Sequence, residues 1–435
     1  METNNKSTRL VAIVAMIFLF GMIAFVTNLA APIGVIWKNQ PALQGSNTLG
    51  MLGNMMNFLA YLFFGIPSGK MLQRHGYKTT ALVAVACGFA GVFIQYLSGV
   101  VLTHEVLFGL PANFYVYLLG AFVAGISVCI LNTVVNPMLN LLGGGGNKGN
   151  QLILIGGTLN SFLGCLTPML VGALIGQITP RTAISDVNLV LFMAMAVFAV
   201  TFVALSFIPI ADPVTTTAAE DNPGGKTPWS FPHFYFGVIA IFVYVGTEVG
   251  IPGTLNFYLS NTTSAGAGLN PLTAASIGGF AAGTYWFMML IGRTIGGFIG
   301  GKVSSRTMMA AACTIGIVLL VTAILSGSGT RVSIPLFTST NGFQLTVSPL
   351  SALLLILCGL CTSVMWSSIF NMATEGLGSL TAQASGIFMT MVVGGGVLPI
   401  LQNYMADHLG YLISYTVPLI AMAYMLLYAV WLSKK

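Results

Sequence analysis

The chain has 435 residues, of which 56% are hydrophobic and only 6% are charged, and its formal net charge is +6. Its mean hydropathy is +0.90. Soluble domains carry about 25% charged residues, so a soluble protein of this size could not cover its surface with so few. The composition therefore indicates an integral membrane protein embedded in the lipid bilayer. Because the basic residues form no stripe, we expect no nucleic-acid partner.

The first long apolar stretch covers residues 10–37 and contains no charged residue. The core of a signal peptide spans about 7–15 residues, so we interpret this longer stretch as a retained membrane span. The six cysteines all fall in apolar segments, and although Cys358 and Cys361 have CxxC spacing, no histidine cluster accompanies them to indicate a metal site. We therefore expect small buried thiols, with no disulfide framework, no metal and no cofactor.

Polar and Gly/Pro-rich breaks divide the rest of the chain into segments of about 20 apolar residues, the length that crosses the hydrocarbon core. We predict an all-α fold with twelve transmembrane helices, centred near Ala24, Leu59, Gly91, Gly125, Ser161, Ala196, Gly246, Met288, Ile315, Leu360, Val392 and Tyr424. A polar, proline-rich break after the sixth span predicts a linker. The expected domains are an N-terminal six-helix half at 1–209, a linker at 210–232 and a C-terminal half at 233–435.

The basic residues of the predicted loops divide unequally between the two sides of the membrane. The side of both termini receives Lys6, Arg9, Lys70, Arg74, Lys78, Lys148, Lys226, Lys302, Arg306, Lys434 and Lys435. The opposite side receives only Lys38, Arg181 and Arg331. Because short cytoplasmic loops are enriched in Lys and Arg, we predict that both termini are cytoplasmic.

One loop sequence occurs twice, as GIPSGKMLQR at residues 65–74 and as GFIGGKVSSR at residues 297–306. Both copies follow the pattern G-x-x-x-G-K-x-x-x-R and end the second span of their half. Such parallel repeats are typical of transporters that bind substrate between two halves. We predict that these loops and a nearby arginine take part in gating, through Gly65, Gly69, Lys70, Arg74, Arg293, Gly297, Lys302 and Arg306.

The first copy continues to GIPSGKMLQRHGYKTT and resembles the loop between helices 2 and 3 of the major facilitator superfamily, with Gly69 in place of that loop's acid. Further segments resemble one branch of it, the fucose–galactose–glucose:proton symporter family. They are LNTVVNPML (131–139), TLNSF (158–162), YVGTEVG (244–250), YWFMMLIGRTIGG (285–297), MWSSIFNMATEGLG (365–378) and residues 385–411. The resemblance implies sugar transport by alternating access across a bacterial inner membrane.

Polar side chains inside the predicted spans are few, and almost all of them are carboxamides. In hydrocarbon such groups face the bundle interior or a watery cavity. An uncharged carboxamide both donates and accepts hydrogen bonds, which suits the hydroxyls of a neutral sugar, and an aromatic ring suits its C–H face. The predicted substrate-binding residues are Asn28, Asn132, Asn136, Asn160, Glu248, Asn256, Trp366, Asn371, Gln402 and Asn403.

The resemblance also shows two departures from the family. Its proton-coupled members have an Asp on helix 1 and a Glu on helix 4, and the matching positions here are Asn28 and Asn132. An amide does not titrate near neutral pH, so these positions cannot carry a proton. Glu248 is the only acid deep in a span and is the candidate coupling residue. It could carry a proton, pair with Arg293, or bind Na+.

Glycines and a proline interrupt two of the predicted helices near their middles, at Pro252-Gly253 and at Gly394-Gly395-Gly396. Such positions either bend as the halves rock or allow close helix packing. Both alternatives remain open at this point.

We therefore expect a monomeric carrier that takes up a neutral hexose, deoxyhexose or N-acetylhexosamine, coupled to H+, to Na+ or to neither. No catalytic constellation is present, so an enzyme is not expected. Two alternatives from other classes are an exporter of amphipathic compounds and a non-transporting sugar sensor.

Overall fold

The computed structural model describes residues 2–142, 146–175, 182–208, 227–299, 303–338, 342–377 and 380–434. Helices make up almost all of it, as predicted. In the first half they are α1 (Glu2–Asn39), α2 (Asn47–Gly50), α3 (Leu52–Leu97), α4 (Ala112–Leu142), α5 (Gly146–Ile175) and α6 (Asn188–Phe207). Short 3-10 turns precede α2, at Pro41–Leu43, and α6, at Ile184–Val187. Most of the linker predicted at 210–232 lies outside the described residues.

The second half begins after a 3-10 turn at Pro228–Ser230. Its helices are α7 (Pro232–Ser260), α8 (Ala274–Ile299), α9 (Ser305–Ser326), α10 (Leu350–Thr362), α11 (Met365–Thr374), α12 (Thr381–Met391), α13 (Gly394–Leu409), α14 (Tyr411–Ser414) and α15 (Thr416–Leu427). A π-helical turn, Tyr428–Leu432, follows α15. Two antiparallel hairpins join helices: β1 (Val106–Leu107) with β2 (Leu110–Pro111), and β3 (Arg331–Thr338) with β4 (Gly342–Pro349).

Within the described residues, eleven helical segments are long and apolar enough to cross a membrane. The remaining predicted span, centred near Leu59, is the first part of α3. Gly76, with φ of 75° and ψ of 176°, separates it from the rest of α3. A positive φ of this size favours glycine, so the chain turns at Gly76 and two predicted spans follow each other within one long helix.

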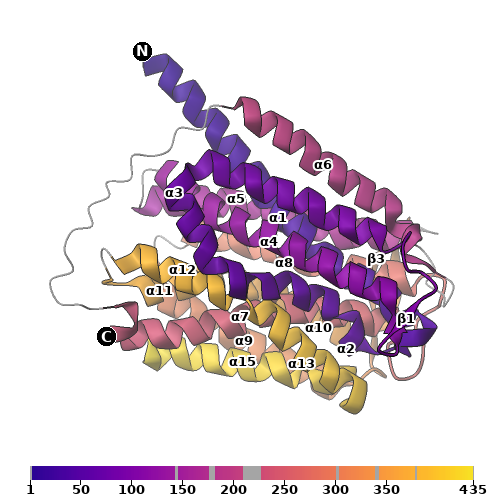
Figure 1. Ribbon diagram of the computed structural model, residues 1–435. Coiled ribbons are helices and arrows are strands. Elements are labelled where there is room, and N and C mark those ends of the chain that lie inside the picture. The colour runs from indigo at the N-terminus through magenta and orange to yellow at the C-terminus, as the bar shows by residue number, and fades with distance from the viewer. Residues whose placement is uncertain are drawn as a thin grey trace.

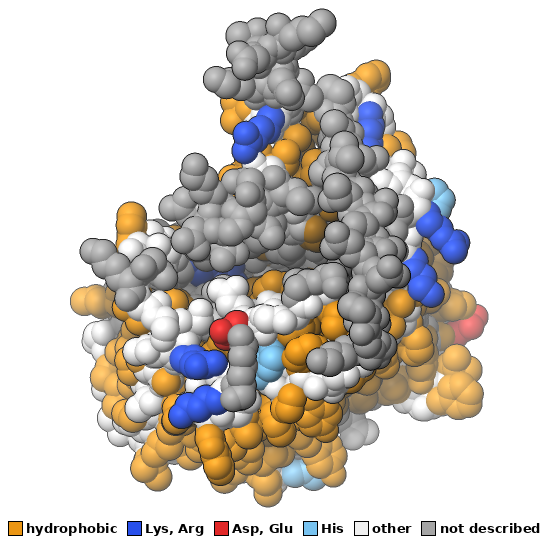
Figure 2. Space-filling view, turned by 90° about the vertical axis from the view of Figure 1, so that its left-hand side faces the viewer, with side chains coloured by type: hydrophobic (Ala, Val, Ile, Leu, Met, Phe, Trp, Pro, Cys, Tyr) orange, Lys and Arg blue, Asp and Glu red, His pale blue; other side chains and the backbone are white. Residues whose placement is uncertain are grey.

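The spans lie side by side with both termini at one end of the molecule and both hairpins at the other (Figure 1). We call these the terminal end and the hairpin end. The terminal end carries the basic side chains of Arg9, Lys70, Arg74, Lys78, Arg306 and Lys434, and Figure 2 shows it face-on, with blue side chains around a rim whose flanks are hydrophobic. Lys38 and Arg331 lie at the hairpin end.

The two halves meet through small residues that let helix backbones approach closely. A Cβ on Gly279 of α8 would lie 2.5 Å from the carbonyl oxygen of Pro168 on α5, and a Cβ on Gly283 would lie 2.5 Å from that of Cys165. On the other side of the bundle, Asn54 of α3 donates a hydrogen bond of 2.8 Å to the carbonyl oxygen of Gly395 on α13. These contacts hold the halves together away from the terminal end.

The eleventh predicted span is interrupted where the three glycines begin, since α12 ends at Met391 and α13 starts at Gly394. The glycines also sit in tight packing. A Cβ on Gly394 would overlap the carbonyl oxygen of Phe242 on α7, and one on Gly395 would lie 2.6 Å from the Phe58 ring. Of the two alternatives drawn from the sequence, the structure shows close packing at this segment, and bending as the halves rock stays a prediction.

We predict that Gly394→Ala lowers thermal stability, by about 1–3 kcal/mol, because the added methyl group overpacks a backbone contact between α13 and α7. The measurement is the melting temperature of the purified protein. Melting is detected as the loss of the monodisperse peak in size-exclusion chromatography after heating. Gly386→Ala in α12 is the matched control, since a Cβ there meets nothing within 4 Å. Equal melting temperatures for the two variants would contradict the packing argument.

Candidate functional site

A cavity of about 520 Å³ lies between the two halves, in the middle of the bundle. It is lined from the first half by α1, α3, α4 and α5, and from the second by α7, α8, α9, the α10–α11 junction, α11 and Val392 just after α12. Pockets for small molecules typically measure about 300–1,000 Å³, so this one has room for a molecule of that class.

The cavity opens toward the terminal end. Its lining runs from mid-membrane residues on α1 and α7 to Phe298, Ser305 and Met308 at the terminal ends of α8 and α9. Toward the hairpin end the two halves are instead in close contact, as where a Cβ on Gly50 of α2 would lie 3.3 Å from the Phe257 ring of α7. The structure is therefore open at the terminal end and closed at the hairpin end.

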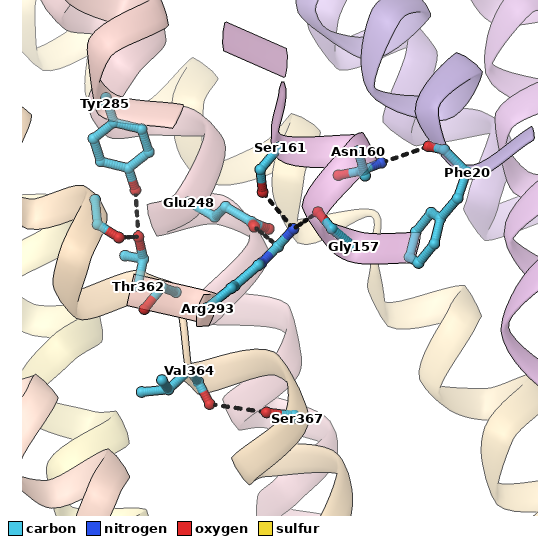
Figure 3. Close-up of polar contacts among 12 residues, drawn as sticks. Phe20, Gly157, Asn160, Ser161, Glu248, Tyr285, Arg293, Thr362, Val364 and Ser367 are labelled. Atoms are coloured by element: carbon cyan, nitrogen blue, oxygen red, sulfur yellow. Dashed lines mark hydrogen bonds and ion pairs between the residues drawn. The ribbon is translucent and has the colours of Figure 1, made fainter. Parts of the chain in front are cut away.

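Five predicted carboxamides line this cavity: Asn28, Asn132, Asn136, Asn160 and Asn371. Asn28 Nδ2 donates to the Ala24 carbonyl of its own helix at 2.9 Å. Asn160 Nδ2 donates to the Phe20 carbonyl on α1 at 2.8 Å, and Figure 3 shows its oxygen turned the other way. The amide groups of Asn28 and Asn160 are thus both held by hydrogen bonds from their nitrogens.

Asn132 and Asn136, one helical turn apart on α4, form a connected pair. Asn136 Nδ2 lies 3.0 Å from the Asn132 carbonyl oxygen and 3.3 Å from Asn132 Oδ1. Asn132 Nδ2 donates to the hydroxyl of Tyr61 on α3 at 2.6 Å. This chain fixes the orientation of the Asn132 side chain at the cavity wall.

An ion pair crosses the cavity wall between Glu248 on α7 and Arg293 on α8, with 3.3 Å between Glu248 Oε1 and Arg293 Nη2. The two side chains are only 12% and 14% exposed, respectively. Arg293 Nη1 also donates to the Gly157 carbonyl at 3.0 Å and to Ser161 Oγ at 2.7 Å, both on α5 (Figure 3). The guanidinium group therefore joins the second half to the first.

Arg293, which we predicted to take part in gating, lies on α8 in the eighth predicted span and lines the cavity. The helix continues for six residues beyond Arg293, to Ile299, and the gating role of Arg293 stays a prediction. Of the alternatives for Glu248, the structure shows pairing with Arg293.

Two tryptophans and a tyrosine contribute aromatic surface to the cavity, together with Phe20, Phe58 and Phe298. Trp286 on α8, Trp366 on α11 and Tyr61 on α3 all line it. Trp366 packs against Tyr244 with ring centroids 6.2 Å apart. Aromatic faces beside carboxamides are the arrangement that suits a ligand with both C–H and hydroxyl surfaces.

Three predicted binding residues do not reach this cavity. Asn403 on α13 is fully buried and donates to Thr254 Oγ1 and to the Pro399 carbonyl. Gln402 is also buried, and its Oε1 would lie 2.6 Å from a Cβ on Gly250. Asn256 on α7 accepts a hydrogen bond from Ser260. Their side chains pack between helices closer to the hairpin end, where the bundle is closed.

The predicted gating loops lie at the terminal end. Lys70 and Arg74 are exposed there, and Gly65 allows α3 to approach α12, where a Cβ would lie 2.7 Å from Thr390 Oγ1. In the second half, Arg306 pairs with Glu375 at 3.6 Å, a contact within one half. Gly297 lines the cavity, a Cβ on Gly69 would meet nothing within 4 Å, and Lys302 lies outside the described residues.

Sequence reasoning missed the wall contributed by the α10–α11 junction. Ser363, Val364 and Ser367 line the cavity where the tenth predicted span is interrupted between α10 and α11. Ser363 Oγ donates to the Leu360 carbonyl at 2.6 Å, so its hydroxyl bonds the backbone of the preceding turn. The sequence signal for this wall was the pair of serines, Ser367 and Ser368, that follows Trp366.

Comparison with known proteins gives relatives along the whole chain, although no family model matches it. The chain is 29% identical to a Brucella abortus protein named glucose/galactose transporter, over 100% of this chain and 97% of that protein. It is 19% identical to the Escherichia coli protein named L-fucose-proton symporter, over 81% of this chain and 77% of that one. A crystal structure of the E. coli fucose:proton symporter superposes with a TM-score of 0.67 at 17% identity, covering 98% of this chain and 100% of that chain.

The structural match shows that the chain shares the fold of this symporter. The chain has the fold of these transporters, and the resemblance of its motifs to the fucose–galactose–glucose:proton symporter branch of the major facilitator superfamily is confirmed. Its relatives are transporters and not enzymes, as expected.

We predict that Arg293→Met destabilises the protein by about 1–3 kcal/mol, because it leaves the Glu248 carboxylate in the cavity wall without its counter-charge. Adding Glu248→Gln should restore most of the loss, since the remaining amide carries no charge. Melting temperatures of the two single variants and the double variant test this. A double variant less stable than Arg293→Met alone would exclude charge compensation.

Proposed function

We propose that this protein carries a neutral monosaccharide across the inner membrane of a bacterial cell by alternating access, in the direction of uptake. The monosaccharide is a hexose, a deoxyhexose or an N-acetylhexosamine. In the proposed orientation both termini are cytoplasmic, so the terminal end faces the cytoplasm and the cavity is open inward.

The observation that carries the proposal is the chemistry of the cavity wall. Five carboxamides and two tryptophans line it, and the one arginine in that lining is paired with its one carboxylate. Carboxamides can both donate and accept hydrogen bonds with sugar hydroxyls. A phosphorylated or carboxylated sugar would require an unpaired cation, and the guanidinium of Arg293 is already engaged by Glu248, Gly157 and Ser161.

The relatives support the same substrate class. The Brucella protein is named for glucose and galactose, and the E. coli protein for L-fucose and the proton. These are neutral monosaccharides that differ in the positions of a few hydroxyl groups. A cavity whose polar side chains are mainly uncharged is consistent with all of them.

We further propose that Glu248 orients the sugar and does not carry a coupling proton. Its carboxylate has a permanently charged partner 3.3 Å away, and protonation of Glu248 would leave that guanidinium uncompensated in the cavity wall. The positions that match the acids of the proton-coupled family members are Asn28 and Asn132, which cannot titrate. Any coupling to H+ or Na+ would then depend on another group.

Uptake by proteoliposomes tests the proposed function. A radiolabelled panel of neutral monosaccharides, one sugar phosphate and one sugar acid is offered with a proton gradient, a Na+ gradient or neither. We expect saturable entry of at least one neutral sugar and no entry of the charged ones, and Glu248→Gln should leave any gradient-driven accumulation ratio unchanged. Failure of every neutral sugar to enter would remove the proposal and favour an exporter or a sensor.

A pair of variants on α1 tests the role of the cavity carboxamides. Asn28→Ala should raise the KM for the transported sugar about 3- to 10-fold, the effect of losing one or more neutral hydrogen bonds. Asn39→Ala is the matched control, because Asn39 makes the same contact with the carbonyl four residues earlier but lies outside the cavity lining. Equal KM values for the two variants would exclude Asn28 from the binding site.

A further inference from the structure

A second cluster of charged and polar side chains lies at the hairpin end, outside the cavity lining. It consists of Lys38, Asn47, Phe257, Asp407 and Tyr411. Lys38 ends α1 and Asn47 begins α2, so both belong to the first half. Phe257 on α7, Asp407 on α13 and Tyr411 on α14 belong to the second half. We call this cluster the hairpin-end latch.

The Lys38 side chain crosses from the first half to the second. Lys38 is 3% exposed, and its ammonium group donates to the Tyr411 hydroxyl at 3.1 Å and contacts the Phe257 carbonyl at 3.5 Å. Lys38 Nζ also lies 4.6 Å from the centre of the Phe257 ring, within cation–π range. A buried ammonium group is costly unless it is compensated, so these contacts with the second half stabilise it where it lies.

Asp407 makes the reciprocal connection, from the second half to the start of the second span. Its two carboxylate oxygens accept hydrogen bonds from the backbone N–H groups of Asn47 and Thr48, at 2.8 and 2.9 Å. They also accept from the side chains of Ser46, Asn47 and Thr48. A carboxylate satisfies the free N–H groups at a helix start and interacts favourably with the helix dipole.

Asn47 joins the two charges. Its Oδ1 accepts from Lys38 Nζ at 2.8 Å and from the Tyr411 hydroxyl at 2.8 Å, while its Nδ2 donates to Asp407 Oδ1 at 2.7 Å. A single carboxamide therefore connects an ammonium group of one half to a carboxylate of the other. If the halves separate at this end, Asn47 loses Asp407 and Tyr411, whereas its hydrogen bond with Lys38 lies within the first half.

Two glycines beside the cluster allow its helices to approach closely. A Cβ on Gly50 would lie 3.0 Å from Lys38 Cβ and 3.3 Å from the Phe257 ring. A Cβ on Gly34 would overlap the Gly50 carbonyl and lie 3.2 Å from that ring. Without side chains at these two positions, α1, α2 and α7 come close enough for Lys38 to reach the second half.

We propose that the hairpin-end latch holds this end of the protein closed and biases the empty carrier toward the state open at the terminal end. It acts through the contacts of Lys38 and Asp407 across the two halves. Opening the hairpin end would expose the helix start that Asp407 caps and leave the Lys38 ammonium group without its Tyr411 and Phe257 partners. This inference concerns the empty protein and does not rest on which substrate it carries.

The test measures the separation of the halves at the hairpin end without substrate. Spin labels are placed on Ala42→Cys, just after α1, and on Ser264→Cys, just after α7, both of which are exposed positions. The background is a folded variant without the six native cysteines, reconstituted in lipid nanodiscs. Distances between the labels are measured by double electron–electron resonance.

When the latch residues are unchanged, we expect a short distance between the two spin labels to dominate. Lys38→Met and Asp407→Asn should each raise the ratio of long to short distances about tenfold, which corresponds to about 1.4 kcal/mol. Tyr411→Phe should act in the same direction with a smaller effect. Arg331→Met is the matched control, because Arg331 lies at the same end but donates to Ala267 within its own half.

Two results would overturn the proposal. One is a dominant long distance when the latch is intact, and the other is an unchanged distribution in both Lys38→Met and Asp407→Asn. Melting temperatures establish that each variant is folded, and Tyr411→Phe, which removes one hydroxyl group only, provides a variant with minimal risk to folding. Because no sugar is present, the outcome is independent of the uptake assay.

Discussion

Every polar group inside the hydrocarbon of a bilayer must find a partner within the protein or in a watery cavity, and the rest of this structure depends on that constraint. It explains why the spans are helices and why their few carboxamides point into the bundle. It also explains why some of those carboxamides line the cavity and others lie between packed helices. Asn28 and Asn160 anchor their nitrogens on backbone carbonyls at the cavity wall, whereas the Asn403 nitrogen donates to Thr254 and to the Pro399 carbonyl between two packed helices.

The same constraint determines how the only ion pair at membrane depth among the described residues is built. Glu248 and Arg293 lie on neighbouring helices of one half, and the guanidinium group has donors left over for α5 of the other half. Charge neutralisation and contact between the halves are therefore provided by one side chain. In contrast, the hairpin-end latch keeps its ammonium and carboxylate groups apart and connects them through Asn47.

Much of this architecture could be predicted from sequence, because span length, apolar runs and paired loop motifs are local signals. Those signals located the helices, and five of the predicted carboxamides do line one cavity. The depth of a residue along its helix was harder to predict. Gln402 and Asn403 lie on α13, and in the described segment 380–434 only Val392, just before this helix, borders the cavity. The interruption at Ser363 gave no local signal, because the sequence there lacks a glycine or proline. Only the packing of separate helices decides such positions.

The pairing of Glu248 with Arg293 has an electrical consequence. Moving one elementary charge through a membrane potential of 100 mV involves about 2.3 kcal/mol. Because the two charges belong to the same half and lie 3.3 Å apart, they move together as the halves rock, and their displacements cancel. The membrane potential therefore does little electrical work on this pair. The pair does not make the return of the empty carrier voltage-dependent.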